Sequence, residues 1–295
     1  MLSVGFLAVV WGFAWPFTIV GLRYSDPLLL ASLRSILGGV VLYFWRLRKQ
    51  KEPFDARALW IAFVAGSCWV GIPMALTAWA LQYISGGLGS ILQSTTPFFV
   101  AIFAYFLLHE NQFSFVKVTG LLVGFAGIIV LFSDDTVMSV SNITLIAGLA
   151  VLIPSALNAF AQVFARKHFK GEDKLGFMMY ILLFAGFETL PFCFIGGLPK
   201  FILSTELVIS VLYLGILASA VPFVVYFELL QRVDIVILSM VAYVIPIVAV
   251  VAGIIWLGET MSGTDYAGSA LVLLGVILAT QYDVVRSKLL ARKLP

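Results

Sequence analysis

Charged residues are scarce in this sequence. Its 295 residues include 18 Lys and Arg and 15 Asp and Glu, together 11% of the chain, whereas soluble domains carry about 25%. Hydrophobic residues make up 62% of the chain, more than a water-soluble core can bury. The composition therefore excludes an ordinary soluble domain and predicts a chain surrounded by lipid. A net charge of +3 is too small to indicate binding to nucleic acid.

Residues that bind metals or form covalent intermediates are equally scarce. The two cysteines, Cys68 and Cys193, lie inside apolar runs and are expected to be small core residues rather than a disulfide or a metal pair. The two histidines, His109 and His168, lie at loop edges. The sequence also lacks a His-Glu-x-x-His motif, a Gly-x-Ser-x-Gly motif and a Walker phosphate loop. We therefore expect no cofactor, no metal site, no enzymatic activity and no ATP-driven transport by this chain alone.

Long apolar runs fill the space between the polar clusters. A membrane-spanning helix needs about 20 predominantly apolar residues, and ten such runs can be counted. The first lacks the basic start and the cleavage site of a signal peptide, so we interpret it as a membrane helix. The predicted spans are Leu2–Leu22, Pro27–Trp45, Leu59–Leu81, Ser85–Leu108, Phe115–Phe132, Ile143–Ala165, Leu175–Ile195, Leu207–Leu230, Ile235–Leu257 and Tyr266–Tyr282.

The distribution of basic residues predicts the orientation of these spans. Lys and Arg are enriched in the short loops on the cytoplasmic side of a membrane. Only Arg23 and Lys200 lie on the outer side if both termini are cytoplasmic, and Arg34 lies within the second span. The inner loops and the tail then hold Arg46, Arg48, Lys49, Lys51, Arg57, Lys117, Arg166, Lys167, Lys170, Lys174, Arg232, Arg286, Lys288, Arg292 and Lys293. This partition predicts a multi-pass protein of the cytoplasmic membrane with both termini inside.

A set of scarce residues occurs twice along the chain, which indicates an internal duplication. Four pairs are separated by 149 positions (222−73, 231−82, 246−97, 259−110), and two glycine pairs by 148 (268−120, 275−127). The pairs are Pro73 and Pro222, Gln82 and Gln231, Pro97 and Pro246, Glu110 and Glu259, Gly120 and Gly268, and Gly127 and Gly275.

Because each copy holds five spans, the second copy must cross the membrane in the opposite sense. The predicted fold is thus an all-α integral membrane protein of ten transmembrane helices. They form two inverted five-helix repeats, residues 1–138 and 139–295, around a central cavity. Inverted repeats are frequent in transporters. Inverted channels and purely structural bundles are the alternatives.

Several polar and aromatic residues share helix faces within the predicted spans and are candidates for binding a solute. Trp11 and Trp15 are four residues apart, and so are Asn158 and Gln162 in the equivalent span of the second copy. A cavity lined by such residues suits a solute with an apolar body and a polar end. The alternatives are hydrogen bonds between helices and tryptophans that face lipid. The complete set of substrate-binding candidates is Trp11, Trp15, Gln93, Thr96, Asn158, Gln162 and Tyr243.

Two prolines and two charges inside the spans are further candidates. Pro97 and Pro246 are equivalent in the two copies and are predicted to kink their helices, as hinges or as cavity walls. Arg34 and Glu188 each lie about seven residues from the outer end of a span, roughly 10 Å deep at 1.5 Å per residue. Intramembrane charges are costly. Arg34 could bind a substrate carboxylate, Glu188 could take up a proton, or the two could form a structural ion pair.

The motifs resemble those of the EamA family within the drug/metabolite transporter superfamily. The similar residues are Val10-Trp11-Gly12-Phe13, Ser32-Leu33-Arg34, Pro97 with Glu110, and Gly258-Glu259-Thr260 followed by Gly268 and Gly275. The resemblance implies a ten-helix bundle with a central cavity, alternating access, and in many cases export of amino acids or other metabolites. The second copy has no equivalent of Ser32-Leu33-Arg34 near Tyr180, so no symmetric role for the arginine is expected.

These observations lead to a functional hypothesis. The chain is predicted to be a secondary transporter that moves small organic solutes, such as amino acids or related metabolites, out of the cytoplasm by alternating access. A membrane channel or a lipid-translocating protein is the alternative. The expected partners are a small-molecule substrate and the lipid bilayer, and transport is either proton-coupled or facilitative. The sequence leaves the oligomeric state open.

Overall fold

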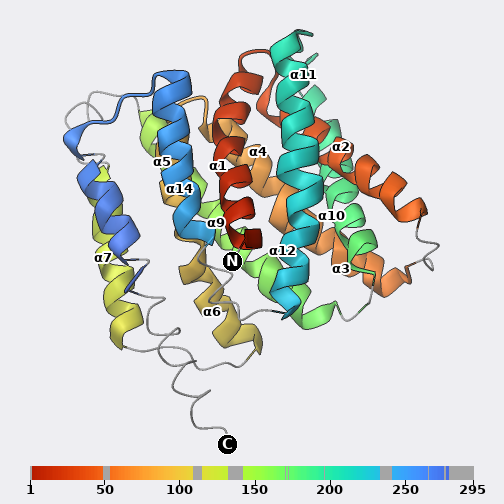
Figure 1. Ribbon diagram of the computed structural model, residues 1–295, viewed down its shortest axis with the longest axis horizontal. Helices are drawn as coiled ribbons and strands as arrows, with labels where there is room; N and C mark the ends of the chain where they lie inside the picture. Colours follow the sequence, from red (N-terminus) through yellow and green to blue (C-terminus); the bar gives the residue numbers. More distant parts are fainter. Residues whose placement is uncertain are drawn as a thin grey trace, which may run out of the picture.

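The protein is a bundle of helices, described here from a computed structural model (Figure 1). The structure describes residues 2–48, 54–108, 115–131, 142–169, 171, 173–195, 197–232, 241–264, 266–275 and 277–278. Within these ranges the chain forms helices and one isolated antiparallel bridge, between Ser25 and Phe201, and no strand. The prediction of an all-α membrane protein is confirmed.

Each of the ten predicted spans coincides with helical residues. Within the described residues, seven helical stretches are long and apolar enough to cross a membrane, and they match the first four spans and the sixth to eighth. The fifth span is the 17-residue helix α7, and the last two appear as shorter apolar helices. The helices are α1 Leu2–Leu22, α2 Pro27–Leu47, α3 Ala56–Gly66, η1 Ser67–Gly71, α4 Ile72–Ala80, α5 Gly86–Gln93, α6 Thr96–Leu108, α7 Phe115–Leu131, α9 Asn142–His168, α10 Lys174–Thr189, η2 Leu190–Phe194, α11 Thr205–Leu212, η3 Tyr213–Ala220, α12 Val221–Arg232, α14 Val241–Ala252 and η4 Gly253–Leu257. A last helix covers Tyr266–Gly275.

Some of the predicted features fall outside the described residues. These are Glu110, the repeat boundary between residues 138 and 139, and the basic C-terminal tail. The side chain of Tyr243 also lies outside them, although its backbone belongs to α14.

The described residues contain three widened π-helical turns, η1, η3 and η4, and the first two lie at equivalent places in the two repeats. In η1 the amide of Ile72 donates to the carbonyl of Ser67, and in η3 the amide of Val221 donates to the carbonyl of Ile216, each five residues back. Each of these two turns ends just before one of the repeated prolines, Pro73 and Pro222. Proline has no amide hydrogen and clashes with the carbonyl four residues earlier. The wider turn accommodates that clash and changes the face that the helix presents.

The fourth predicted span is broken rather than continuously helical. The helix α5 ends at Gln93 and α6 begins at Thr96, so that Pro97 is the second residue of α6, where its missing amide hydrogen costs nothing. Proline at position 97 leaves the carbonyl of Gln93 without its usual amide donor. Three consecutive hydroxyl groups bond to this carbonyl and to those of Ile91 and Leu92, which also accept from backbone amides. Ser94 donates to Ile91 at 2.6 Å, Thr95 to Leu92 at 2.7 Å, and Thr96 to Gln93 at 2.7 Å. Most of the polar patch before Pro97 thus maintains the break, because lipid offers no other partner.

Glycine contacts between α7 and the last helix show the relationship between the two repeats. A Cβ atom added to Gly127 would lie 2.6 Å from the Val272 nitrogen and 2.7 Å from the Gly268 oxygen. A Cβ atom added to Gly275 would overlap the backbone of Gly120 and Gly124. Gly127 and Gly275 are equivalent in the two repeats, and so are Gly120 and Gly268. The two contacts are therefore related by the pseudo-two-fold axis. Since residue 127 meets 268 while 275 meets 120, the two helices run antiparallel, as inverted repeats require.

A second reciprocal contact joins α2 to α10. A Cβ on Gly39 would lie 3.1 Å from the Leu183 nitrogen, and a Cβ on Gly186 would lie 2.9 Å from the Ile36 nitrogen. Both pairs of equivalent positions differ by 147 (186−39, 183−36). The two helices that follow the first loop of each repeat thus cross on the pseudo-two-fold axis.

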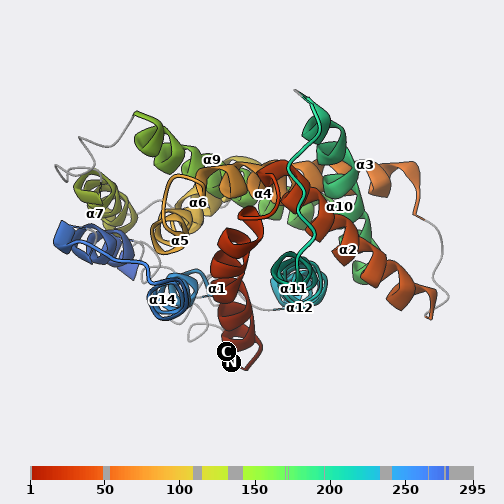
Figure 2. The same ribbon diagram turned by 90° about the horizontal axis from the view of Figure 1, so that it is seen from above.

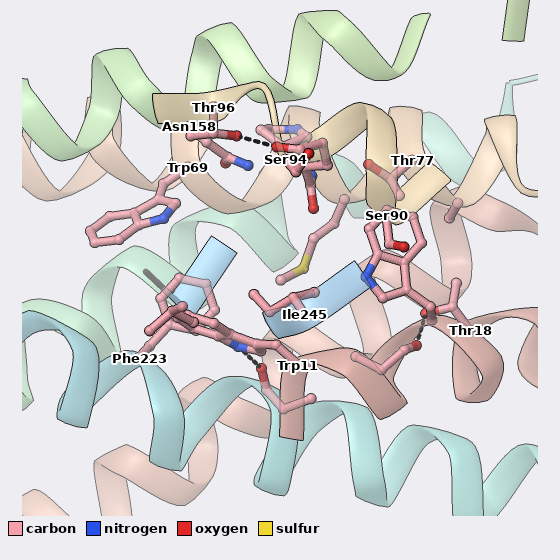
Figure 3. Close-up of a pocket in the computed structure, with 18 of the residues that line it drawn as sticks. Trp11, Thr18, Trp69, Thr77, Ser90, Ser94, Thr96, Asn158, Phe223 and Ile245 are labelled. Atoms are coloured by element: carbon pink, nitrogen blue, oxygen red, sulfur yellow. Dashed lines mark hydrogen bonds between the residues drawn. The ribbon is translucent and has the colours of Figure 1, made fainter. Parts of the chain in front are cut away.

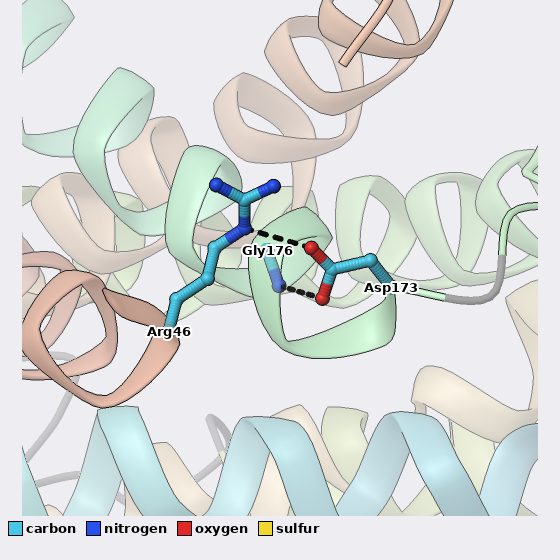
Figure 4. A network of polar contacts seen from close by, with 3 residues as sticks. All are labelled: Arg46, Asp173 and Gly176. Carbon is cyan, nitrogen blue, oxygen red and sulfur yellow. Dashed lines mark hydrogen bonds and ion pairs between the residues drawn. The ribbon is translucent and has the colours of Figure 1, made fainter. Parts of the chain in front are cut away.

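The residues that precede α2 and α10 repeat the same relationship. Asp26 and Asp173, also 147 apart (173−26), each occupy the position just before the helix. Asp26 accepts from the amide of Lys200 at 2.7 Å. Asp173 pairs with Arg46 at 2.7 Å and accepts from the amide of Gly176 at 3.0 Å (Figure 4). Asp26 therefore ties the start of α2 to the chain that follows α10, and Asp173 ties the start of α10 to the last turn of α2.

Glu259 closes another contact between the repeats. Its carboxylate accepts hydrogen bonds from the amides of Gly86 at 3.0 Å and Gly87 at 3.4 Å, at the start of α5. A carboxylate at a helix start is stabilised by the free amides and by the helix dipole. Glu259 therefore caps the start of α5 and joins it to the chain after η4.

The close glycine contact yields a stability prediction. Gly275→Ala should lower the free energy of unfolding by about 1–3 kcal/mol, because the new methyl group meets backbone atoms that cannot move aside. Gly263→Ala is the matched control, since nothing lies within 4 Å of that position. Thermal unfolding of both variants in detergent measures the difference. Equal melting temperatures would contradict the reciprocal packing.

Candidate functional site

A cavity of about 220 Å³ lies between helices of both repeats. Seen from above, α1 lies between α14 on one side and α11 with α12 on the other (Figure 2). The cavity walls come from α1, α2, η1, α4, α5, α6, α9, η3, α12 and α14 (Figure 3). Neither repeat alone could build it.

The structure brings most of the candidate binding residues to this one cavity. Its wall includes Trp11, Trp15, Gln93, Thr96, Asn158 and Gln162, together with Arg34 and Pro97. Glu188 and Pro246 do not contribute to it, although Pro246 lies inside α14 as expected. The functional roles assigned to all of these residues remain predictions.

Aromatic side chains form one wall of the cavity. The ring of Trp11 lies 5.9 Å from Phe223 and 5.3 Å from Tyr226, and Trp69 contacts the same two rings at 5.5 and 5.8 Å. The indole nitrogen of Trp11 donates to the carbonyl of Ala218 in η3 at 3.1 Å. The hydroxyl of Tyr226 donates to Gln162 Oε1 at 2.7 Å. These bonds fix the aromatic wall in place and engage the donor hydrogens of Trp11 and Tyr226.

Arg34 brings a positive charge to the cavity without a negative partner. Its side chain is 9% exposed, and Nη2 donates to the hydroxyl of Ser219 in η3 at 3.2 Å. Its Nε is buried and has no hydrogen-bond partner. A buried cation is costly unless an anion compensates it. An anionic group that entered the cavity would therefore stabilise the buried guanidinium of Arg34.

Glu188 does not pair with Arg34. One of its oxygens accepts a hydrogen bond from the hydroxyl of Ser67 in η1, and the other is buried without a partner. It also lies against Gly71, where any side chain would overlap the carboxylate. Each of the two charges thus reaches a serine in the π-helical turn of the opposite repeat. The ion pair between them that equal depth would permit is not formed.

Several residues of the cavity wall were not predicted from the sequence. Trp69, Thr77, Phe223 and Tyr226 line it but were not candidates. A signal for two of them exists, because Trp69, Pro73, Thr77 and Leu81 are spaced four residues apart and all line the cavity. Following the repeated Pro73 along its helix face would have found Trp69 and Thr77. In the part of the chain that the structure describes, no group of metal-binding side chains is present.

Comparison with known proteins now assigns the family. The model of the EamA-like transporter family matches residues 1–133 and again residues 145–281. The chain belongs to the EamA-like transporter family. Two successive matches agree with the duplication seen in the sequence and in the glycine contacts.

Relatives of this EamA-like protein are found in bacteria and plants. The uncharacterized transporter YoaV of Bacillus subtilis is 26% identical over 282 residues, covering 95% of this chain and 96% of its own length. A chloroplastic WAT1-related protein of Arabidopsis thaliana is 28% identical over 280 residues, covering 91% of this chain and 66% of its own length. Protein PecM of Dickeya dadantii is 25% identical, covering 91% and 88%.

The fold of the EamA-like chain also occurs among solved structures. A crystal structure with 19% sequence identity matches 95% of this chain and 96% of its own, with a TM-score of 0.66. At this identity the likeness shows the fold alone.

Proposed function

We propose that this protein is a secondary transporter that moves small amphipathic organic solutes by alternating access, with amino acids and related metabolites as the first candidates. The observation that carries the proposal is the cavity between the repeats, which combines an aromatic wall with the unpaired Nε of Arg34. Membership of a transporter family and the absence of recognised enzyme motifs support transport rather than catalysis.

The chemistry of the cavity supports a solute with an apolar body and an anionic group. The rings of Trp11, Trp69 and Phe223 offer a large apolar surface. The guanidinium of Arg34 suits a carboxylate, since arginine binds carboxylates through several hydrogen bonds in a fixed geometry. The neutral hydroxyl of Ser219 leaves that capacity unused.

Inverted repeats supply a mechanism for alternating access. Two halves that pack through reciprocal contacts can exchange conformations, so that the cavity opens first to one side of the membrane and then to the other. The widened turns before Pro73 and Pro222, the widened turn η4 after α14 and the break before Pro97 are places where the helices that line the cavity depart from regular geometry. We propose that these positions, together with Pro246, absorb the motion.

The distribution of Lys and Arg supports cytoplasmic termini. We propose further that the protein lies in the cytoplasmic membrane and exports cytoplasmic solutes. A reporter enzyme that is active only outside the cytoplasm should be inactive when it is fused after Pro295. Activity of that fusion would contradict the proposed orientation.

Purified protein in liposomes provides the functional test. It should transport radiolabelled phenylalanine or leucine with saturable kinetics, and Arg34→Gln should lower the uptake efficiency at least tenfold, the loss expected for one hydrogen bond to a charged group. Arg23→Gln is the control, because Arg23 is exposed outside the cavity wall.

Three outcomes would count against the proposal or refine it. Failure of the folded protein to transport any solute of a broad metabolite panel would overturn it, and ion conductance without saturable uptake would favour a channel. If Glu188→Gln leaves uptake driven by a pH gradient intact, Glu188 is not the coupling group.

A further inference from the structure

Gly89, in the short helix α5, lies directly behind the cavity wall. A Cβ atom added to Gly89 would lie 2.7 Å from Cζ3 and 3.4 Å from Cε3 of Trp15, and 3.3 Å from Cδ2 of Leu81. Trp15 and Leu81 line the cavity, and so does Ser90, the next residue of α5 (Figure 3). Gly89 itself is buried and does not line it. Gly89 thus supports the outer ring of Trp15 from behind.

A second glycine of α5 contacts the same tryptophan. A Cβ atom added to Gly86 would lie 3.4 Å from Cβ of Trp15 and 3.0 Å from Cδ1 of Ile19. Residues three apart share a helix face, so Gly86 and Gly89 form a slot on α5 into which the side chain of Trp15 packs. Glycine inside a helix is less favourable than alanine. The close approach of Trp15 accounts for a glycine at position 89.

The ring of Trp15 is closely packed on the sides that do not border the cavity. Its side chain is 6% exposed and belongs to a buried apolar cluster that includes Leu81, Ile91 and Leu92. Such packing leaves few voids larger than a water molecule. A methyl group at position 89 would therefore push the ring toward the open space that it borders, which is the cavity.

We propose that Gly89 is a positioning residue that sets the width of the cavity, and with it the size of the solute that can bind. It acts through Trp15, because the absence of a side chain lets the ring lie back against α5. The inference rests on the proposed function of the cavity as a solute-binding site. A misfit of one methylene in an apolar pocket changes relative affinity by about 10- to 200-fold, so a small displacement of the ring is measurable.

Two probes that differ in size test this role. L-alanine and L-phenylalanine carry the same charged groups, and only phenylalanine has a ring. Their affinities are measured by calorimetry on the full-length protein in lipid nanodiscs. Gly89→Ala should weaken the binding of phenylalanine by about tenfold or more and change the binding of alanine by less than about threefold.

Two further variants separate the position of the ring from a general effect on the helix. Phenylalanine at position 15 lacks the outer ring that carries Cζ3 and Cε3, so Gly89→Ala should not affect the affinity for either probe in a Trp15→Phe protein. Gly87→Ala is the matched control in α5. Its new methyl group would meet Cγ2 of Val250 at 3.0 Å, and Val250 does not line the cavity, so the preference between the probes should stay unchanged.

The width of the cavity can also be measured without a transported solute. In a protein whose Cys68 and Cys193 are replaced by alanine, Ala14→Cys introduces a thiol on the cavity wall. Gly89→Ala should slow its reaction with N-benzylmaleimide, relative to the smaller N-methylmaleimide, by about tenfold or more. If Gly89→Ala does not fold, as judged by its melting temperature, Trp15→Phe replaces it and should favour the larger reagent.

The outcomes separate this inference from the proposed function. Equal effects on both probes, or a loss of phenylalanine binding that persists in the Trp15→Phe protein, would overturn the role of Gly89 and leave the transport proposal standing. If the wild type binds neither probe, the proposed solute class fails, and the ratio of the two maleimide rates decides on Gly89. A ratio that Gly89→Ala leaves unchanged would overturn the inference.

Discussion

Lipid provides no hydrogen-bond partner for a polar group, and this constraint determines where the structure is regular and where it is not. An unpaired buried polar group costs several kcal/mol in such surroundings. The chain meets the constraint locally wherever its helices are interrupted. At the break before Pro97, the hydroxyl of Thr96 donates to the carbonyl of Gln93, which has lost its usual amide donor to proline, and the indole of Trp11 donates to the carbonyl of Ala218 in the widened turn. Three of the buried side-chain atoms left without a partner, on Arg34, Thr77 and Asn158, lie on the cavity wall. Those on Glu188, Ser210 and Ser269 lie elsewhere.

The helix contacts that hold the scaffold together obey the pseudo-two-fold symmetry, whereas the polar side chains of the cavity do not. Glycines bring equivalent helices into reciprocal contact at α7 with the last helix and at α2 with α10. Asp26 and Asp173 tie the two ends of the α2–α10 pair in the same reciprocal way. The charges do not follow this rule, because Ile181 and Val41 occupy the positions equivalent to Arg34 and Glu188 at the offset of 147. A symmetric backbone thus carries an asymmetric set of polar groups, which suits a solute whose two ends differ.

The scaffold could largely be predicted from the sequence. The apolar runs predict the spans, and the recurrence of scarce residues at a nearly constant spacing indicates the repeat. The predicted first span, Leu2–Leu22, has the same bounds as α1. The link between Asp26 and Asp173 was missed because the offset between the repeats changes from 147 to 149 and then to 148 along the chain. The depth of Arg34 and Glu188 can be estimated from their distance to the helix ends, but their direction around the helix axis cannot. For this reason the sequence could not show that Arg34 and Glu188 bond to different serines rather than to each other. Thr77 was missed for a related reason, since the sequence does not show which hydroxyls bond to their own helix and which remain free.

The central claim is that the cavity between the repeats holds the transported solute, and site-directed thiol labelling tests it most directly. In a protein whose Cys68 and Cys193 are replaced by alanine, a cysteine is introduced at Ala14, which lines the cavity, or at Arg23, which is exposed in the turn after the same helix and does not line it. A saturating concentration of a transported solute should slow the reaction of Ala14→Cys with a small maleimide and leave Arg23→Cys unaffected. Labelling of Ala14→Cys that is insensitive to every transported solute would contradict the account.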